Sequence, residues 1–213
     1  MQKIFMEQFS ATSYAILGQL ALRSWSAYDL IQEMKRNFHY FWPRAESGLY
    51  AELKRLKKLD CVHTTKRKTG KRQSTVYAIS PKGKTVLETW LGTEPAEFKL
   101  EFEGLLRVFL SRFGAPEMLK KTLLKVEEDA RVLSVLATNI AREYLAGTAP
   151  FQEEIEVRTF VFDFLVHYAD LYKEWVVRTR EELQLREGRS ADERKKMALE
   201  LMRKNIAKLN LPV

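Results

Sequence analysis

Two long stretches of the sequence, residues 116–147 and 153–184, repeat apolar side chains in alternating steps of four and three. This spacing aligns side chains along one side of a helix, as in a coiled coil, and a strand cannot reproduce it. The first repeat is Leu119, Leu123, Val126, Ala130, Leu133, Ala137, Ile140 and Tyr144; the second is Val157, Val161, Phe164, Tyr168, Leu171 and Trp175. Because only the short segment 147–150 joins them, we expect two antiparallel helices.

The second stretch holds more apolar residues than one seam requires. Phe160, Phe162, Leu165 and Tyr172 lie off the repeat. We therefore expect one face of this helix to pack within the protomer and another against a second copy, with a last helix at 190–208 bracing them. The sequence predicts that residues 93–213 form an all-α, antiparallel helical dimerisation domain.

Positive charge is concentrated in the first part of the chain. Of the formal charge of +8, residues 1–92 carry 16 Lys and Arg against 7 Asp and Glu, whereas residues 93–213 carry 20 against 21. A concentrated basic region indicates a polyanionic partner, most often nucleic acid. The alternative, a basic surface that only confers solubility, usually has interleaved acids. We place a domain boundary after residue 92, where Gly92 and Pro95 interrupt the pattern.

Residues 1–92 have the element order of a winged helix-turn-helix domain. Helical apolar spacing covers residues 10–23, 26–38 and 46–60, and a fourth helix follows Ser80 and Pro81. Between the third and fourth helices, residues 65–73 carry five cations and no acid, flanked by β-prone runs. This pattern predicts a two-stranded hairpin with Gly70 near its turn. The fold class is mainly α with a small β-hairpin.

The third helix, residues 46–60, has one apolar face formed by Leu49, Leu53 and Leu56. In a winged helix-turn-helix this helix enters the major groove, and the hairpin tip reaches flanking backbone or the minor groove. The residues predicted to face away from the leucines are Ser47, Tyr50, Lys54, Arg55 and Lys58. The first three lie nearest the helix N-terminus and are candidates for base edges, and the cations can neutralise phosphates. An ordinary solvated helix is the alternative, and the adjacent basic hairpin argues against it.

Four segments resemble the PadR family of transcriptional regulators: YAILGQLAL, AYDLIQEM, FWPRAESGLYAELKRLKKLDCV and VYAISPKGKTVLETWL. The resemblance covers nearly all of residues 12–92. The second half, beginning KLEFEGLLRVFLSRFG, is similar to the helical C-terminal domain of the long PadR subfamily that includes virulence-gene activators. This resemblance implies a dimeric DNA-binding regulator, usually a repressor, sometimes responsive to small molecules.

Family DNA contacts carry over by resemblance to particular positions. They are Tyr28, Ser47 and Tyr50, and the wing residues from Gly70 to Gln73, including Lys71, Arg72 and Gln73. The chain departs from the family at Ser26 and Ala27, where His-Gly is common, and in a wing that lacks the common proline. Because the wing keeps its charge, we expect it to keep backbone binding.

Several other classes of protein have no support in the sequence. We expect no signal peptide, and no apolar run approaches the roughly 18 residues that a membrane span needs. Cys61 is the single cysteine, and His39, His63 and His167 have no metal-ligand spacing. Catalytic motifs and phosphate loops are missing from the sequence. We therefore expect a cytoplasmic protein with no catalytic residues, no metal and no cofactor.

These observations lead to one hypothesis for the whole chain. It is a homodimeric transcription regulator, a repressor, that binds an inverted-repeat operator in double-stranded DNA through helix 46–60 and the wing 65–73. Aromatic residues near the domain junction raise the question of an apolar or aromatic effector: Phe5, Phe9, Trp90, Phe98, Phe102 and Trp175. The alternative is an interaction protein whose basic domain binds RNA or an acidic protein.

Overall fold

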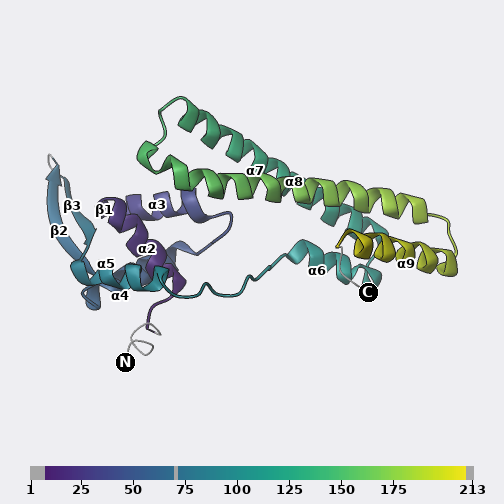
Figure 1. The fold of residues 1–213 in the computed structure, drawn as a ribbon, viewed down its shortest axis with the longest axis horizontal. Helices are drawn as coiled ribbons and strands as arrows, with labels where there is room; N and C mark the ends of the chain where they lie inside the picture. The colour runs from purple at the N-terminus through teal and green to yellow at the C-terminus, as the bar shows by residue number, and fades with distance from the viewer. Residues whose placement is uncertain (1–7, 70–71, 210–213) are drawn as a thin grey trace. The chain divides into compact units, whose positions relative to one another are not determined.

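The computed structural model describes residues 8–69 and 72–209. It divides into two compact units, Met1–Lys99 and Leu100–Val213 (Figure 1). The division falls within residues 93–102, which contain no helix or strand. This stretch begins just after the last helix of the front unit, where the sequence indicated a domain boundary.

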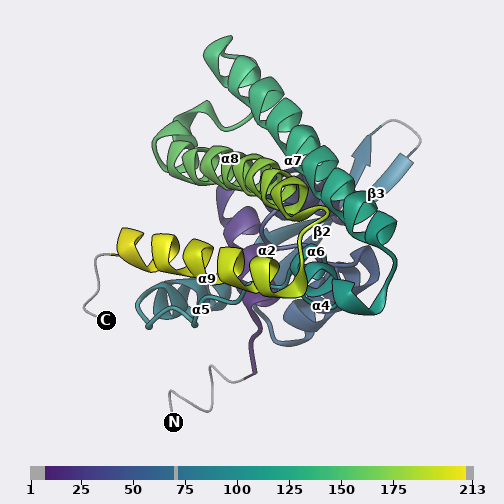
Figure 2. The same ribbon diagram turned by 90° about the vertical axis from the view of Figure 1, so that its right-hand side faces the viewer.

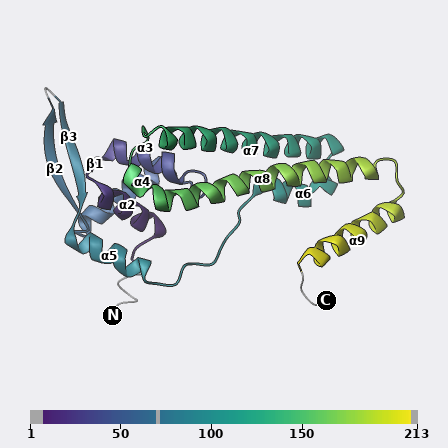
Figure 3. The ribbon, with the colours of Figure 1, turned by 45° about the horizontal axis from the view of Figure 1, so that its top comes forward.

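The front unit has the order of elements predicted from the sequence, with one addition. Its elements are α2 (Ala11–Leu22), β1 (Trp25–Ser26), α3 (Ala27–Phe38), α4 (Glu46–Lys58), β2 (Val62–Thr69), β3 (Arg72–Ile79) and α5 (Pro81–Leu91). Strands β2 and β3 extend as a two-stranded ribbon beyond the helices of this unit (Figure 3). The winged helix-turn-helix fold is therefore confirmed.

Three serines begin three of these helices. Ser10 accepts a hydrogen bond from the backbone N–H of Ser13 at 3.2 Å, and Ser26 accepts one from Asp29 at 3.1 Å. Ser80 accepts from the N–H of Gly83 at 3.0 Å, with a proline directly after the cap. Each serine satisfies a backbone donor that has no partner within the helix.

The sheet has three strands in the order β1-β3-β2, whereas the sequence predicted only a hairpin. The additional strand pairs Trp25 with Tyr77 and Ser26 with Val76. The Trp25 side chain is buried, and its indole N–H donates to the carbonyl of Gln19 at 3.0 Å. A two-residue strand has no detectable alternation in the sequence, which is why the prediction missed it.

Close packing between α5 and the start of the hairpin depends on Gly83. A Cβ at this position would lie 2.2 Å from the carbonyl oxygen of Cys61 and 2.9 Å from the Ile79 side chain. The Cys61 oxygen already accepts the N–H of Ser80 at 3.0 Å, so it belongs to the junction between strand and helix.

We expect Gly83→Ala to lower the free energy of unfolding by about 1–3 kcal/mol, because the backbone must move to admit a methyl group. Urea denaturation of the full chain measures this change. Gly18→Ala is the matched control, since nothing lies within 4 Å of a Cβ there and alanine favours the helix interior. We expect the control to raise stability by about 0.5–1 kcal/mol. Equal effects at both positions would contradict the close packing at Gly83.

The second unit is helical throughout its ordered elements. These are α6 (Glu103–Phe109), the 3-10 turn η1 (Ser111–Phe113), α7 (Pro116–Leu145), η2 (Gln152–Glu154), α8 (Ile155–Arg186) and α9 (Ala191–Lys208). Helices α7 and α8 lie side by side and run in opposite directions (Figures 2 and 3). The turn between them uses left-handed backbone at Gly147 and Phe151.

The central part of the predicted seam of α7 is confirmed, because Leu123, Val126, Ala130, Leu133 and Ala137 are all buried. Its ends, Leu119, Ile140 and Tyr144, are half-buried. As a contact within the chain, the predicted seam of α8 is wrong for most of its residues. Val157, Val161, Phe164 and Leu171 are exposed.

Helix α8 instead buries Ala169 and Val176, and Tyr172 and Leu183 pack beside Val176 on the α7 core. The sequence contained two apolar faces and gave no means to tell which one packs within the chain. Ala169 is a small residue, which allows close approach of two helices.

Helix α9 begins close to the predicted start at residue 190, with a capping box between Ser190 and Glu193. None of its residues is buried. Within the described residues, no helix combines the length and apolar character needed to cross a membrane.

Candidate nucleic-acid interface

Helix α4 separates an apolar face from a polar one. Leu49, Leu53 and Leu56 are buried, as predicted. Ser47, Lys54 and Lys58 are exposed, and Tyr50 is half-buried. Lys54 and Lys58 are one helical turn apart, so two cations stand on the same side of this helix.

Helix α3 precedes α4 and is anchored at its start. Ser26 belongs both to β1 and to the cap of α3, so sheet pairing and capping fix the same residue. Tyr28 lies in the first turn of α3 with 64% of its surface exposed. Farther along, the Lys35 ammonium donates to the Glu46 carboxylate at 2.7 Å, linking α3 to the first residue of α4.

The hairpin presents cations on both faces of a narrow ribbon. Lys66 pairs with Thr75, Arg67 with Ser74 and Lys68 with Gln73. Because side chains alternate along a strand, Lys66 and Lys68 share one face and Arg67 occupies the other. These three cations are exposed.

The remaining wing residues lie at the end of the ribbon. Arg72 pairs with Thr69, and Gln73 is the next residue of β3. The predicted wing residues Gly70 and Lys71 lie outside the described residues.

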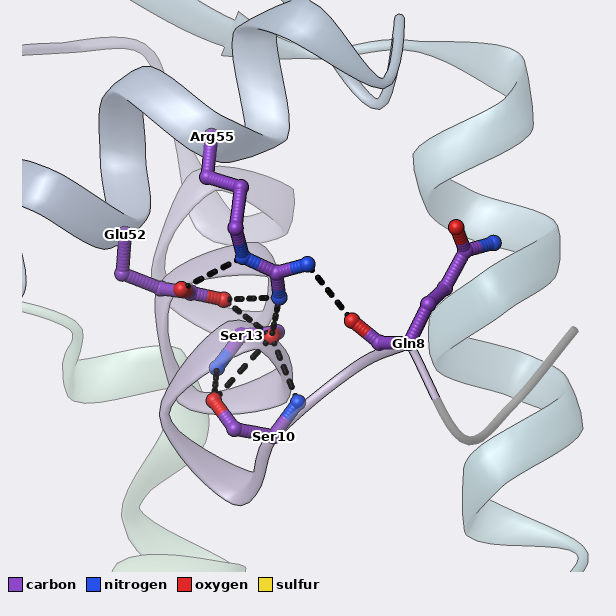
Figure 4. Close-up of polar contacts among 5 residues, drawn as sticks. All are labelled: Gln8, Ser10, Ser13, Glu52 and Arg55. Atoms are coloured by element: carbon purple, nitrogen blue, oxygen red, sulfur yellow. Dashed lines mark hydrogen bonds and ion pairs between the residues drawn. The ribbon is translucent and has the colours of Figure 1, made fainter.

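Arg55 differs from the sequence prediction, since its guanidinium does not point freely away from the core. Its Nε donates to Glu52 Oε2 at 2.8 Å, and its Nη2 to Glu52 Oε1 at 2.7 Å (Figure 4). Nη2 also donates to the Ser13 hydroxyl at 3.1 Å, and Nη1 to the Gln8 carbonyl at 2.6 Å.

Ser13 completes this arrangement from α2. Its hydroxyl donates to Glu52 Oε1 and accepts the Ser10 N–H at 2.8 Å. We call Gln8, Ser10, Ser13, Glu52 and Arg55 together the Arg55 clasp (Figure 4). Sequence reasoning missed it, although Glu52 and Arg55 are three residues apart on one helix, a spacing typical of ion pairs.

Within the clasp, the pKa of Glu52 reflects opposing effects. Burial of the carboxyl raises its pKa, but hydrogen bonds from Arg55 and Ser13 and the charge of Arg55 outweigh burial. The pKa of Glu52 therefore lies below its ordinary value of 4.5. The ionised carboxylate is the form that stabilises the fold.

The lowered pKa predicts how stability changes in acid. The folded-state pKa is below the unfolded value, so the contribution of Glu52 is complete above about pH 4.5 and disappears as the pH falls through the folded-state pKa. We expect Glu52→Gln to lower the free energy of unfolding by about 1–3 kcal/mol at neutral pH. The difference from wild type should shrink as the pH falls. Urea titrations at a series of pH values measure it, with the exposed Glu88→Gln as the control. A constant difference would contradict the prediction.

Comparison with known proteins identifies the front unit. Residues 16–89 match the family model described as the transcriptional regulator PadR-like family. The chain carries a PadR-like domain. This domain spans most of α2 and continues into α5, so it includes α4 and the ribbon.

One known protein is similar to this chain in sequence over part of its length. The negative transcriptional regulator PadR of Bacillus subtilis is 32% identical over 119 residues, which are 53% of this chain and 65% of that protein. The match therefore spans less than two thirds of the relative.

The fold extends the likeness to both units. The structure of Bacillus subtilis PadR in complex with operator DNA is similar with a TM-score of 0.63 and 20% identity, covering 78% of this chain and 94% of that one. The Vibrio cholerae virulence activator AphA has a TM-score of 0.63 and 19% identity, over 82% and 99% of the two chains. At such identities the likeness establishes the fold. The matched family and these relatives are transcriptional regulators, not enzymes.

The aromatic residues considered for an effector lie in two separate clusters, one in the front unit and one in the second unit. Tyr14 stacks on Trp90 with ring centroids 4.5 Å apart, and Phe9 lies 6.1 Å from Tyr14. In the second unit, Phe102 stacks on Tyr172 at 4.8 Å and contacts Trp175 edge-on at 6.2 Å. Phe98 is exposed and Phe5 lies outside the described residues. Across the described residues, no group of His, Cys, Asp and Glu could hold a metal ion.

Proposed function

We propose that this chain is a homodimeric transcription regulator, a repressor, that binds operator DNA through its PadR-like domain. The supporting observation is the combination of α4, whose exposed face carries Ser47, Lys54 and Lys58, with an adjacent ribbon of exposed cations. A major groove admits one helix, and lysines and arginines beside it neutralise phosphates.

The proposed contacts divide into two kinds. Base edges are contacted from the first turns of α4 by Ser47, Tyr50 and Lys54. Backbone phosphates are contacted by Tyr28, Lys58 and the wing 65–73, including Lys71, Arg72 and Gln73. Phosphate contacts give affinity with little sequence preference, and base contacts give the preference.

The proposed dimer is formed by residues 93–213. Supporting it, α8 leaves Val157, Phe160, Phe164 and Leu171 exposed, a long apolar face that water does not favour. A two-fold dimer presents its two recognition helices to half-sites about 34 Å apart, or a multiple of that distance. The operator is then an inverted repeat.

We propose a regulated repressor that acts in the cytoplasm, and two features of the Bacillus subtilis relative support its repressor role and its regulation. The Bacillus subtilis relative is a negative regulator. Its structure in complex with p-coumaric acid is similar to this chain with a TM-score of 0.59 and 21% identity, over 80% and 96% of the two chains. We propose that a small aromatic or apolar effector modulates DNA binding here also.

Selection of bound duplexes from a random DNA pool tests the proposal. We expect enrichment of one inverted repeat, which should lose affinity as each half-site is scrambled. The same experiment includes single- and double-stranded RNA of similar length as competitors. No enriched duplex, together with RNA that competes equally, would instead support a basic protein that binds RNA or an acidic partner.

A further inference from the structure

The Arg55 clasp occupies the guanidinium that a DNA contact would need. Each of the three guanidinium nitrogens donates to a protein acceptor: Nε and Nη2 to Glu52, Nη2 also to Ser13, and Nη1 to the Gln8 carbonyl. A phosphate would have to displace a two-point bond to a carboxylate, which is among the stronger pairings available to arginine.

The partners in the clasp belong to different elements. Glu52 and Arg55 lie on α4, Ser13 on α2, and Gln8 in the segment before α2. The Ser13 hydroxyl donates to Glu52 and accepts from the Ser10 N–H and from Arg55 Nη2, and its oxygen also lies 3.2 Å from the Ser10 hydroxyl oxygen. The clasp is thus a saturated polar joint between α4 and the start of α2.

The clasp restricts rotation of α4 about its axis more strongly than its buried leucine face does. Burial of Leu49, Leu53 and Leu56 is favourable but non-directional, so it tolerates small rotations of the helix. Fork-shaped bonds to a carboxylate tolerate much less. Tyr50 lies about 140° around the helix from Arg55, so a rotation released at Arg55 moves Tyr50 with it.

Resting on the proposed function, we propose that Arg55 is a positioning residue for DNA recognition. It fixes the rotation of α4 through Glu52 and Ser13 and does not contact phosphate. Glu52 is its necessary partner, so this acidic residue on a DNA-reading helix promotes operator preference.

The test measures affinity of the full chain for its selected operator and for random DNA, each over a range of salt. The variants are Arg55→Lys, which keeps the charge and loses the fork, and Glu52→Gln, which keeps the shape and loses the carboxylate. We expect each to reduce the ratio of operator to random affinity at least about fivefold per half-site, the lower end of a lost base contact. The salt slope on random DNA should not change.

The double variant and two controls sharpen this result. Arg55→Lys with Glu52→Gln should reduce the ratio no further than either change alone, because both break one joint. Glu88→Gln makes the same charge change on the exposed surface of α5 and should leave the ratio unchanged. Lys58→Met should weaken both DNAs alike and lower the salt slope by about 0.9 per protomer.

Changes in DNA affinity opposite to those expected would overturn the proposal. If Arg55 contacts phosphate, Glu52→Gln frees it and raises affinity for both DNAs, and Arg55→Lys keeps operator preference. Circular dichroism melts establish that each variant is folded at the assay temperature, and if Glu52→Gln is not, Ser13→Ala tests the same joint from α2. A wild-type chain that prefers no DNA would refute the proposed function before any variant is compared.

Discussion

We expect the full chain to sediment as a dimer at micromolar concentration and the Phe164→Glu, Leu171→Glu variant as a monomer. Both side chains are more than half exposed on α8, at 54% and 53%, and lie seven residues apart on one side of the helix. Burial of each such side chain contributes about 1.5–3 kcal/mol, and a two-fold interface uses each one twice. In the variant, a dimer would have to bury glutamate carboxylates that have no partner. The free-energy cost of this burial exceeds the stabilisation that the native apolar side chains provide.

DNA binding provides a second measure of the same change. A dimer should bind the inverted repeat about 10²–10⁴-fold more tightly than an isolated half-site, because its second domain binds at high effective concentration. The monomeric variant should bind both equally. The two added glutamates weaken binding to both DNAs, so their electrostatic effect cancels in this ratio of affinities.

Val177→Glu is the control for this experiment. Val177 is exposed on α8 but lies about 120° around the helix from Leu171. We expect it to leave the dimer intact. Dimers in both variants, with unchanged helicity, would show that another surface joins the protomers.

Features encoded by neighbouring residues were predictable from the sequence. Ser10, Ser26 and Ser80 each cap the helix that the sequence placed after them. The buried leucines of α4 follow from their spacing alone. Because these signals act over three or four residues, they survive whatever tertiary structure surrounds them.

Features that depend on distant partners were not predictable. Helix α8 has two apolar faces, and only packing on α7 decides that Val176 is buried and Phe164 is not. Arg55 lies on the helix where the sequence predicted it, but its hydrogen-bond partners Ser13 and Gln8 are 42 and 47 residues away in the sequence. The spacing of Glu52 and Arg55 is a local signal of an ion pair, but no local pattern shows that distant acceptors also bind this guanidinium.

The two proposed DNA-binding elements should respond differently to substitution. Tyr50→Ala should narrow the difference between operator and random DNA by about 1–3 kcal/mol per half-site, because a base contact is lost. Lys66→Ala with Lys68→Ala removes two exposed cations from one face of the ribbon. This pair should weaken operator and random DNA alike and flatten the salt slope by about 1.8 per protomer. Equilibrium binding to both DNAs across a salt series measures all three quantities.

Arg67→Ala identifies which face of the ribbon approaches DNA, since Arg67 points opposite to Lys66 and Lys68. If it leaves the salt slope unchanged while the lysine pair lowers it, the lysine face lies against the backbone. If Tyr50→Ala leaves the operator preference unchanged, Ser47 or Lys54 must contact the bases from the same helix. Loss of that preference in the lysine pair, with random binding intact, would reverse the assignment. The ribbon would then contact the bases, and α4 would contact the DNA phosphates.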